Sequence, residues 1–289
     1  MSNIKISLET LKKVKGVGGK TLERILEQHE IDNGNVEEEK YEYDEKLHIN
    51  PNSLLKGDCL TLMNGIPDKS IDMILCDLPY GTTQNKWDSV IPLDKLWKHY
   101  ERIIKDNGAI VLTAQTPFDK VLGASNLKML KYEWIWEKDS GTGFLNAKKA
   151  PLKSHENILV FYKKLPSCSP QMRMGYKPYK TKKGHHGTNY GSDNGAVTKS
   201  SGERYPITNL KFARDKEKTH PTQKPVALME YLIKTYTNEG DLVLDNTMGS
   251  GTTCVACVNT NRQYIGMELD DEYYTVAQTR VNEAIEAKI

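Results

Sequence analysis

The sequence predicts an α/β protein whose central sheet is doubly wound and mostly parallel. Short apolar runs of strand length alternate along the chain with amphipathic stretches of helix length, as in sheets covered by helices on both faces. Two of the predicted strands end in unusual turns. One turn is Asp77-Leu78-Pro79-Tyr80, and the other is a glycine-rich bend at 245–253. Turns of this kind after buried strands are typical of segments that deliver side chains to a cleft.

The composition limits the class of protein. A chain of 289 residues can hold one large α/β domain and a small appendage. No apolar run reaches the roughly 18 residues of a membrane span, and the N-terminus lacks the apolar segment of a signal peptide. Five cysteines, an odd number at irregular spacing, indicate reduced thiols. We therefore expect a cytoplasmic protein with no membrane partner.

Residues 1–33 predict a helical hairpin of their own. Two apolar helical stripes flank Gly16-Val17-Gly18-Gly19, and several lysines make the segment basic. The turn resembles that of a helix-hairpin-helix motif, which presents backbone N–H groups to a DNA phosphate. A plain helical hairpin used only for packing is the alternative. The acidic stretch 34–47 that follows indicates a linker.

The main domain is expected to begin near residue 48. Its first part predicts a short strand at Leu54-Leu55, before Gly57-Asp58, and a buried strand at 71–76. Further strands are predicted at 109–113, 132–136 and 157–162, with helices at 93–105 and 118–130.

Residues 163–218 interrupt this alternation. They contain 13 Lys and Arg against 4 Asp and Glu, interleaved with tyrosines, although the net charge of the whole chain is only +2. Basic charge mixed with aromatic rings is typical of a nucleic-acid contact surface. A solvated insertion without a partner is the alternative.

The last part predicts a helix at 226–236, a strand at 242–244, a helix at 252–260 and a strand at 263–267. Glycines in the bend at 245–253 would allow a ligand to approach the backbone, and the following helix N-terminus favours a carboxylate. Glu268, at the end of the next strand, can accept the hydroxyls of a ribose. The bend lacks the Lys-Ser/Thr of a phosphate loop. A nucleoside cofactor without a pyrophosphate fits it better, and a tight turn used for packing is the alternative.

The turn at 77–80 offers a carboxylate, main-chain carbonyls beside a proline and an aromatic face. Together these suit a planar ring that carries an exocyclic amine, such as a nucleobase.

The two turns and their order make the chain resemble the β-class amino-methyltransferases of DNA, with a circularly permuted motif order over roughly residues 50–285. The resemblance is carried by six segments: Gly57-Asp58, Asp77 to Tyr80, Lys153 to Asn157, His220 to Pro225, Asp245 to Thr253 and Gly266 to Asp270. It implies a Rossmann-like methyltransferase sheet with a catalytic half at 48–162, a target-recognition insertion at 163–218 and a cofactor-binding half at 219–289.

The resemblance implies a site-specific enzyme that transfers a methyl group from S-adenosyl-L-methionine to N6 of an adenine flipped out of double-stranded DNA. It allows a homodimer and a cognate restriction endonuclease as further partners. The catalytic residues it implies are Asp77, Leu78, Pro79 and Tyr80. The cofactor-binding residues it implies are Asp58, Thr222, Lys224, Asp245, Thr247, Gly249, Ser250, Gly251, Thr252 and Glu268.

Within the resemblance, each group has an expected role. Tyr80 would stack on the flipped base, and Asp77 with the Leu78 carbonyl would accept the N–H bonds of its amine. Lys224 with Thr222 would face the carboxylate of the cofactor. Glu268 would take the ribose hydroxyls. In the same way, Asp58 would take the adenine amine of the cofactor.

Two departures from the family pattern stand out. Leu78 replaces the first proline of the catalytic box, which leaves the main-chain carbonyl in place. Asn246-Thr247 stands where Pro-Phe is common, which removes a ring near the methionine moiety.

Several alternatives stay open. An N4-methyltransferase of cytosine shares this geometry, although an aspartate first in the box favours adenine and a serine favours cytosine. A DNA-binding module without activity is another. Cys76 beside Asp77 raises a cytosine-C5 mechanism, but it sits in an apolar strand without the Pro-Cys box. Cys254 and Cys257 lack a second ligand pair, so we expect no metal site.

Overall fold

The computed structural model describes residues 49–81, 89–182, 197–216 and 222–288. The chain divides into two units, residues 1–45 and 46–289. The predicted N-terminal hairpin and acidic linker lie outside the described residues, as do His220 and Pro221. The described residues all belong to the second unit.

The centre of this unit is an eight-stranded sheet with the order β1-β10-β9-β2-β3-β5-β4-β8. Its strands are β1 (Ser53–Lys56), β2 (Ile71–Asp77), β3 (Ile104–Ala114), β4 (Leu130–Thr142), β5 (Lys153–Phe161), β8 (Asn209–Lys211), β9 (Leu242–Asp245) and β10 (Gln263–Glu268). The five strands β1, β10, β9, β2 and β3 are all parallel to one another. Only β5 runs against its neighbours β3 and β4, and β8 is parallel to β4. The predicted mostly parallel sheet is confirmed.

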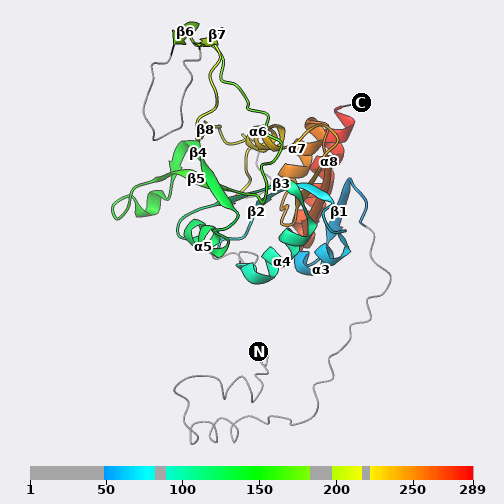
Figure 1. Ribbon diagram of the computed structural model, residues 1–289. Helices are drawn as coiled ribbons and strands as arrows, with labels where there is room; N and C mark the ends of the chain where they lie inside the picture. The colour runs from blue at the N-terminus through cyan, green and yellow to red at the C-terminus, as the bar shows by residue number, and fades with distance from the viewer. Residues whose placement is uncertain (1–48, 82–88, 183–196, 217–221, 289) are drawn as a thin grey trace, which may run out of the picture. The chain divides into compact units, whose positions relative to one another are not determined.

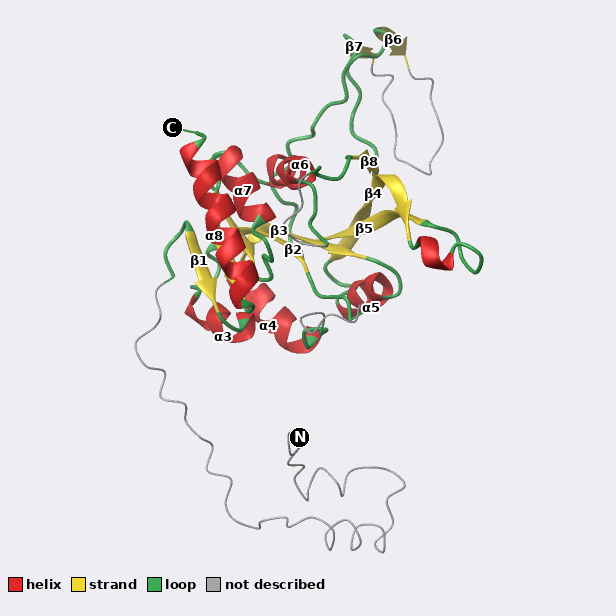
Figure 2. Cartoon of the chain, turned by 180° about the vertical axis from the view of Figure 1, so that it is seen from behind, coloured by secondary structure: helices red, strands yellow, loops and turns green. Residues whose placement is uncertain are grey.

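Helices cover both faces of the sheet (Figures 1 and 2). One face carries α3 (Cys59–Leu62), η1 (Met63–Gly65), α4 (Leu93–Ile103) and α5 (Phe118–Ser125). The other carries α6 (Val226–Tyr236), α7 (Thr252–Asn259) and α8 (Asp271–Glu286). Each face has its own apolar core, so the central strands are buried on both sides. That is why they are continuous apolar runs in the sequence.

Several predicted elements agree with the structure and others differ for local reasons. The helix α6 has the predicted bounds, and β9, α7 and β10 agree within one residue. The helix predicted at 118–130 ends at Ser125, because Asn126 leaves the helical conformation at its C-cap. The sequence analysis also missed α8, whose buried side chains are only Ala277 and Val281. A face this narrow gives little periodic signal.

The strands β4 and β5 form a hairpin, with no helix between them. A strict alternation of strands and helices would have made them parallel. Their connection instead carries a short 3-10 turn, η2 (Phe144–Asn146).

The basic segment 163–216 contributes β8 to the central sheet. It also contributes β6 (Tyr179–Lys182) and β7 (Val197–Ser200), a separate antiparallel ribbon that is visible apart from the central sheet in Figure 1. Within the described part of the chain, no helix is both long and apolar enough to span a membrane.

The glycine-rich bend connects β9 to α7. Gly249 has a φ of 52° and Gly251 a φ of 78°, so the bend uses the left-handed conformation that glycine allows. The positive φ values agree with the glycine pattern, and the approach of a ligand to this backbone stays a prediction.

Replacement of Gly251 by alanine should destabilise the protein beyond the strain of its φ. A Cβ there would lie 3.0 Å from the Cβ of Ala277, which belongs to α8. Gly240 has a similar φ of 83°, and a Cβ there meets no atom of the described chain within 4 Å. Gly240→Ala is therefore a matched control that carries backbone strain alone, about 1–2 kcal/mol.

We expect Gly251→Ala to lower the free energy of unfolding by about 1–3 kcal/mol more than Gly240→Ala does. Urea unfolding of both variants measures the difference. Equal losses of unfolding free energy in the two variants would show that the contact with Ala277 of α8 adds no cost.

Candidate active site at the carboxyl ends of β2 and β9

The two turns singled out in the sequence lie side by side. The strands β2 and β9 are parallel neighbours, with Met73 paired to Val243 and Ile74 to Leu244. Because the strands are parallel, both end at the same edge of the sheet, β2 at Asp77 and β9 at Asp245. The strand order reverses between these two strands, which is where open α/β sheets form binding crevices.

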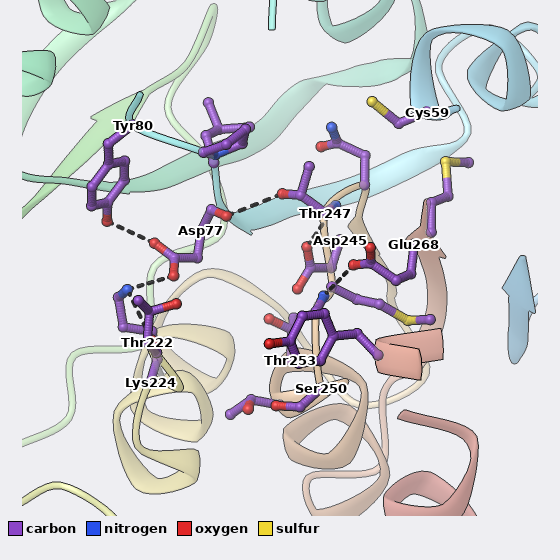
Figure 3. A pocket seen from close by; sticks show the side chains of 18 of the residues that line it. Cys59, Asp77, Tyr80, Thr222, Lys224, Asp245, Thr247, Ser250, Thr253 and Glu268 are labelled. Atoms are coloured by element: carbon purple, nitrogen blue, oxygen red, sulfur yellow. Dashed lines mark hydrogen bonds and ion pairs between the residues drawn. The ribbon is translucent and has the colours of Figure 1, made fainter. Parts of the chain in front are cut away.

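A cavity of about 780 Å³ opens at this edge. Every predicted site residue except Gly251 lines it. These residues are Asp58, Asp77, Leu78, Pro79, Tyr80, Thr222, Lys224, Asp245, Thr247, Gly249, Ser250, Thr252 and Glu268. Figure 3 shows several of them, among them Asp77, Lys224 and Glu268. Gly251 belongs to the bend, where its φ is positive and a Cβ would meet Ala277 of α8. The volume is in the range of small-molecule and cofactor sites.

The Asp77 carboxylate is held by three donors. The Tyr80 hydroxyl donates to Oδ1 at 2.6 Å, and the Thr113 hydroxyl donates to the same oxygen at 2.5 Å. The Lys224 ammonium donates to Oδ2 at 2.5 Å. Burial and the Asp77 charge raise the pKa of Tyr80 well above its usual value, so the phenol stays a donor. The Tyr80 ring lies against Phe118, with ring centroids 5.4 Å apart and planes 25° from parallel.

Lys224 connects Asp77 to a second carboxylate, Glu156, which lies in the segment Lys153 to Asn157 but was not among the predicted site residues. Its ammonium lies 3.3 Å from Glu156, which in turn pairs with Lys138 at 2.6 Å. Burial opposes a charge on Lys224, but the carboxylates of Asp77 and Glu156 raise its pKa and keep it an ammonium. Burial alone would raise the pKa of Glu156, and the two lysines hold it below its usual value. The four side chains form an alternating, electrically balanced chain of charges along the cavity wall.

This placement differs from the role expected for Lys224. The resemblance implied that Lys224, with Thr222, faces the cofactor carboxylate, whereas its ammonium lies on the acid of the catalytic box. Thr222 lines the cavity from an exposed position. The signal that could have revealed Glu156 is a lone acid at the start of the apolar run of β5.

The two turns are also bonded directly to each other. The Thr247 hydroxyl donates to the main-chain carbonyl of Asp77 at 3.2 Å, although the two residues are 170 positions apart. The departure at Asn246 has a structural use as well. Its Oδ1 accepts hydrogen bonds from the Tyr100 hydroxyl at 2.6 Å and from the Cys76 thiol at 2.9 Å. The residue that replaces the usual proline thus fastens the bend to β2 and α4.

Cys76 is buried, and the Asp245 charge adds to burial in raising the pKa of its thiol well above the usual value. A thiol kept neutral in this way is a poor nucleophile. Cys254 and Cys257 are buried in α7.

The acid at the end of β9 is unusual. Asp245 is only 3% exposed and accepts a hydrogen bond from the backbone N–H of Thr247 at 3.1 Å. Burial raises the pKa of Asp245 to about 7. A buried acid with a raised pKa at the wall of a cavity marks a candidate functional site.

Two further carboxylates hold the cavity wall. Glu268 accepts hydrogen bonds from the backbone N–H groups of Gly249 at 2.9 Å and Asp270 at 2.8 Å, and burial raises its pKa. It therefore fixes the bend as well as lining the cavity. Asp58 caps α3 by accepting from the Thr61 N–H at 2.9 Å.

Arg280, which the sequence analysis missed, braces the bend from α8. Its guanidinium donates to the Ser250 carbonyl at 2.6 Å and to the Ser250 hydroxyl at 2.9 Å. It also reaches the Thr252 hydroxyl at 3.1 Å. Arg280 lies on a helix with little amphipathic pattern, so its sequence gave no indication of this contact.

Comparison with known proteins places this geometry in context. The chain is 27% identical over 262 residues to the type II methyltransferase M.BglII of Bacillus subtilis. The alignment covers 80% of this chain and 69% of the relative. It is also 27% identical over 258 residues to the DNA adenine methyltransferase YhdJ of Escherichia coli K12. That alignment covers 80% of this chain and 83% of the relative. The solved structure of the cytosine-N4-specific PvuII DNA methyltransferase superposes with a TM-score of 0.61. It is 16% identical and covers 82% of this chain and 92% of that one.

The family model for N6 and N4 DNA methylases matches residues 71–279, which include both turns of the cavity and all the central strands except β1. This chain therefore belongs to the N6/N4 DNA methylase family.

Proposed function

We propose that this protein transfers a methyl group from S-adenosyl-L-methionine to N6 of an adenine flipped out of double-stranded DNA. The observation that supports it best is the shared cavity, where the amine-accepting corner at Asp77 and the glycine bend at Asp245 meet. One cavity can then hold a donor and an acceptor in line, and such positioning supplies a large part of the rate.

The residues at the bend fit S-adenosyl-L-methionine. The Nδ2 of Asn246 is buried at the cavity wall and has no hydrogen-bond partner in the described part of the chain. Asp245 offers an acid for the cationic end of the cofactor, and Glu268 offers an acceptor for its ribose. When bound, the cofactor supplies an electrophilic methyl group.

The corner at Asp77 fits the target amine. A carboxylate has about four acceptor sites, and Tyr80, Thr113 and Lys224 take three of them. The remaining site is on Oδ2, and the main-chain carbonyl of Leu78 is the second acceptor we propose. Two bonds from the amine hydrogens would draw the nitrogen lone pair out of the ring and toward the methyl group. A leucine in place of the proline leaves this carbonyl available.

Adenine is the proposed target because the box begins with aspartate, as in the adenine enzymes that the chain resembles. A relative that covers most of this chain is named as an adenine methyltransferase. Cytosine-N4 is the second candidate, since the PvuII enzyme is similar in structure and specific for it.

The modified base can be identified directly. DNA from cells that express the full chain should contain N6-methyladenine at one sequence motif, found by single-molecule sequencing and by mass spectrometry of the digested DNA. The variant Asp77→Ala should lose DNA methylation but keep its affinity for S-adenosyl-L-methionine, measured by calorimetry. N4-methylcytosine as the only product would contradict the adenine assignment, and an active Asp77→Ala variant would contradict the mechanism.

Lys224 either holds the Asp77 carboxylate in position or binds the carboxylate of the cofactor, and a substitution can separate these two hypotheses. If its ammonium holds Asp77, Lys224→Met should lower kcat about hundredfold, because the acceptor loses its position. The affinity for the cofactor should change little. Loss of one partner from a buried ion pair should also lower the free energy of unfolding by about 3–5 kcal/mol.

Single-turnover kinetics and calorimetry measure both quantities. Lys224→Arg should recover part of kcat. Lys234→Met, an exposed lysine of α6 that pairs with Glu230, is the control. A large loss of cofactor affinity with kcat kept would instead assign Lys224 to the cofactor carboxylate.

The raised pKa of Asp245 predicts a pH dependence of cofactor binding. Below about pH 7 the folded protein holds this carboxyl protonated, and a cationic ligand must displace the proton. Affinity should therefore rise with pH from 6 to 7.5, by at most about tenfold per unit below the pKa. Calorimetry at several pH values measures this, and Asp245→Asn should bind more weakly with a flat profile. Equal wild-type affinities at pH 6 and 7.5 would show that Asp245 does not meet the cation.

A further inference from the structure

The connection between β4 and β5 carries an exposed apolar tip. We call residues 143–152 the β4–β5 arm; it extends from the hairpin in Figures 1 and 2. Phe144 is 80% exposed and Leu145 is 99% exposed, side by side in the sequence. Such a pair in water is unfavourable unless a partner covers it.

The tip has a defined shape. Gly143 has a φ of 88°, which turns the chain into the short η2 helix. Backbone N–H groups of Asn146 and Ala147 donate to the carbonyls of Gly143 and Phe144 at 2.9 and 3.0 Å. The apolar pair is therefore presented by a folded turn.

Strand direction places the arm at the edge of the cavity. The strand β4 is antiparallel to β5, which is antiparallel to β3, so β4 runs the same way as β3 and β2. Its carboxyl end lies at the same edge of the sheet as Asp77. Thr142, the last residue of β4, lines the cavity, and its ladder partner Lys153 bonds to Gln115, which also lines it.

The charge of the arm selects the kind of partner. From Gly143 to Lys153 the sequence has lysines at 148, 149 and 153 and no acid. A second copy of the chain in a symmetric contact would bring these lysines against one another. A polyanion would neutralise them, and phosphates of a DNA duplex supply such charge beside an apolar base stack.

We propose that the β4–β5 arm is a DNA wedge. In this arrangement Lys148, Lys149 and Lys153 contact phosphates, while Phe144 and Leu145 enter the base stack beside the base that is flipped into the cavity. Apolar side chains of this kind part base steps in other duplexes. The inference rests on the proposed function and adds the element that assists the opening of the duplex.

The test uses the full chain and two duplexes that carry the methylation motif found by sequencing. One is fully paired, and in the other the target base faces an abasic site, so that it flips out without breaking a base pair. We expect Phe144→Ala/Leu145→Ala to slow single-turnover methylation of the paired duplex by about tenfold or more. On the abasic duplex the loss should be under about threefold. Phe144→Trp should keep most of the activity.

The control is Val121→Ala/Leu127→Ala, two apolar residues that are 57% and 70% exposed elsewhere. Thermal unfolding should be unchanged in both double variants, because all four side chains are exposed. Equal rates for wild type and the arm variant on the paired duplex, or equal losses on both duplexes, would overturn the wedge. So would a wild-type dimer that the arm variant turns into a monomer in sedimentation. Wild-type protein that methylates neither duplex would instead contradict the proposed function.

Discussion

The site depends on the pairing of β2 with β9. These strands are far apart in the sequence, yet their contact brings an aspartate from each to one edge of the sheet. Side chains of both strands are buried on both faces of the sheet, Ile74 and Leu244 on one and Met73 and Val243 on the other. Burial of this apolar surface, at about 25 cal/mol per Å², fixes which strands are neighbours. Single hydrogen bonds such as that from Thr247 to the Asp77 carbonyl contribute about 1 kcal/mol and set the details.

The two halves of the cavity differ in how their buried carboxylates are paired with cations. At the Asp77 half, Lys138, Glu156 and Lys224 give every buried charge an opposite neighbour, which offsets the cost of removing charges from water. Asp77 can then remain an acceptor for a neutral amine. At the bend, burial raises the pKa of Asp245, and no ion pair of the described residues offsets that effect. The missing charge is one that a cationic ligand can supply.

Local patterns were enough to predict both turns, the strands beside them and the helix α6 with its bounds. Each of these depends on neighbours in the sequence: apolar runs, glycines, a proline. The partners of Lys224 could not be predicted in this way, since Glu156 and Asp77 come from different strands and meet only in the folded sheet. The same holds for Arg280, whose contact with the bend depends on how α8 packs. The predicted N-terminal hairpin stays a prediction.

Strand direction explains why so much chemistry gathers at one edge. The strands β2, β9 and β10 end there, and α6 begins there with Lys224 just before its first turn. The hairpin of β4 and β5, although antiparallel, returns its connection to the same edge because β4 follows the direction of β2. Under the proposed function, segments at this edge that contact DNA can change in length and sequence without disturbing the buried strands beneath the cavity. In that case the antiparallel end of the sheet would serve substrate choice, and the parallel strands would serve catalysis.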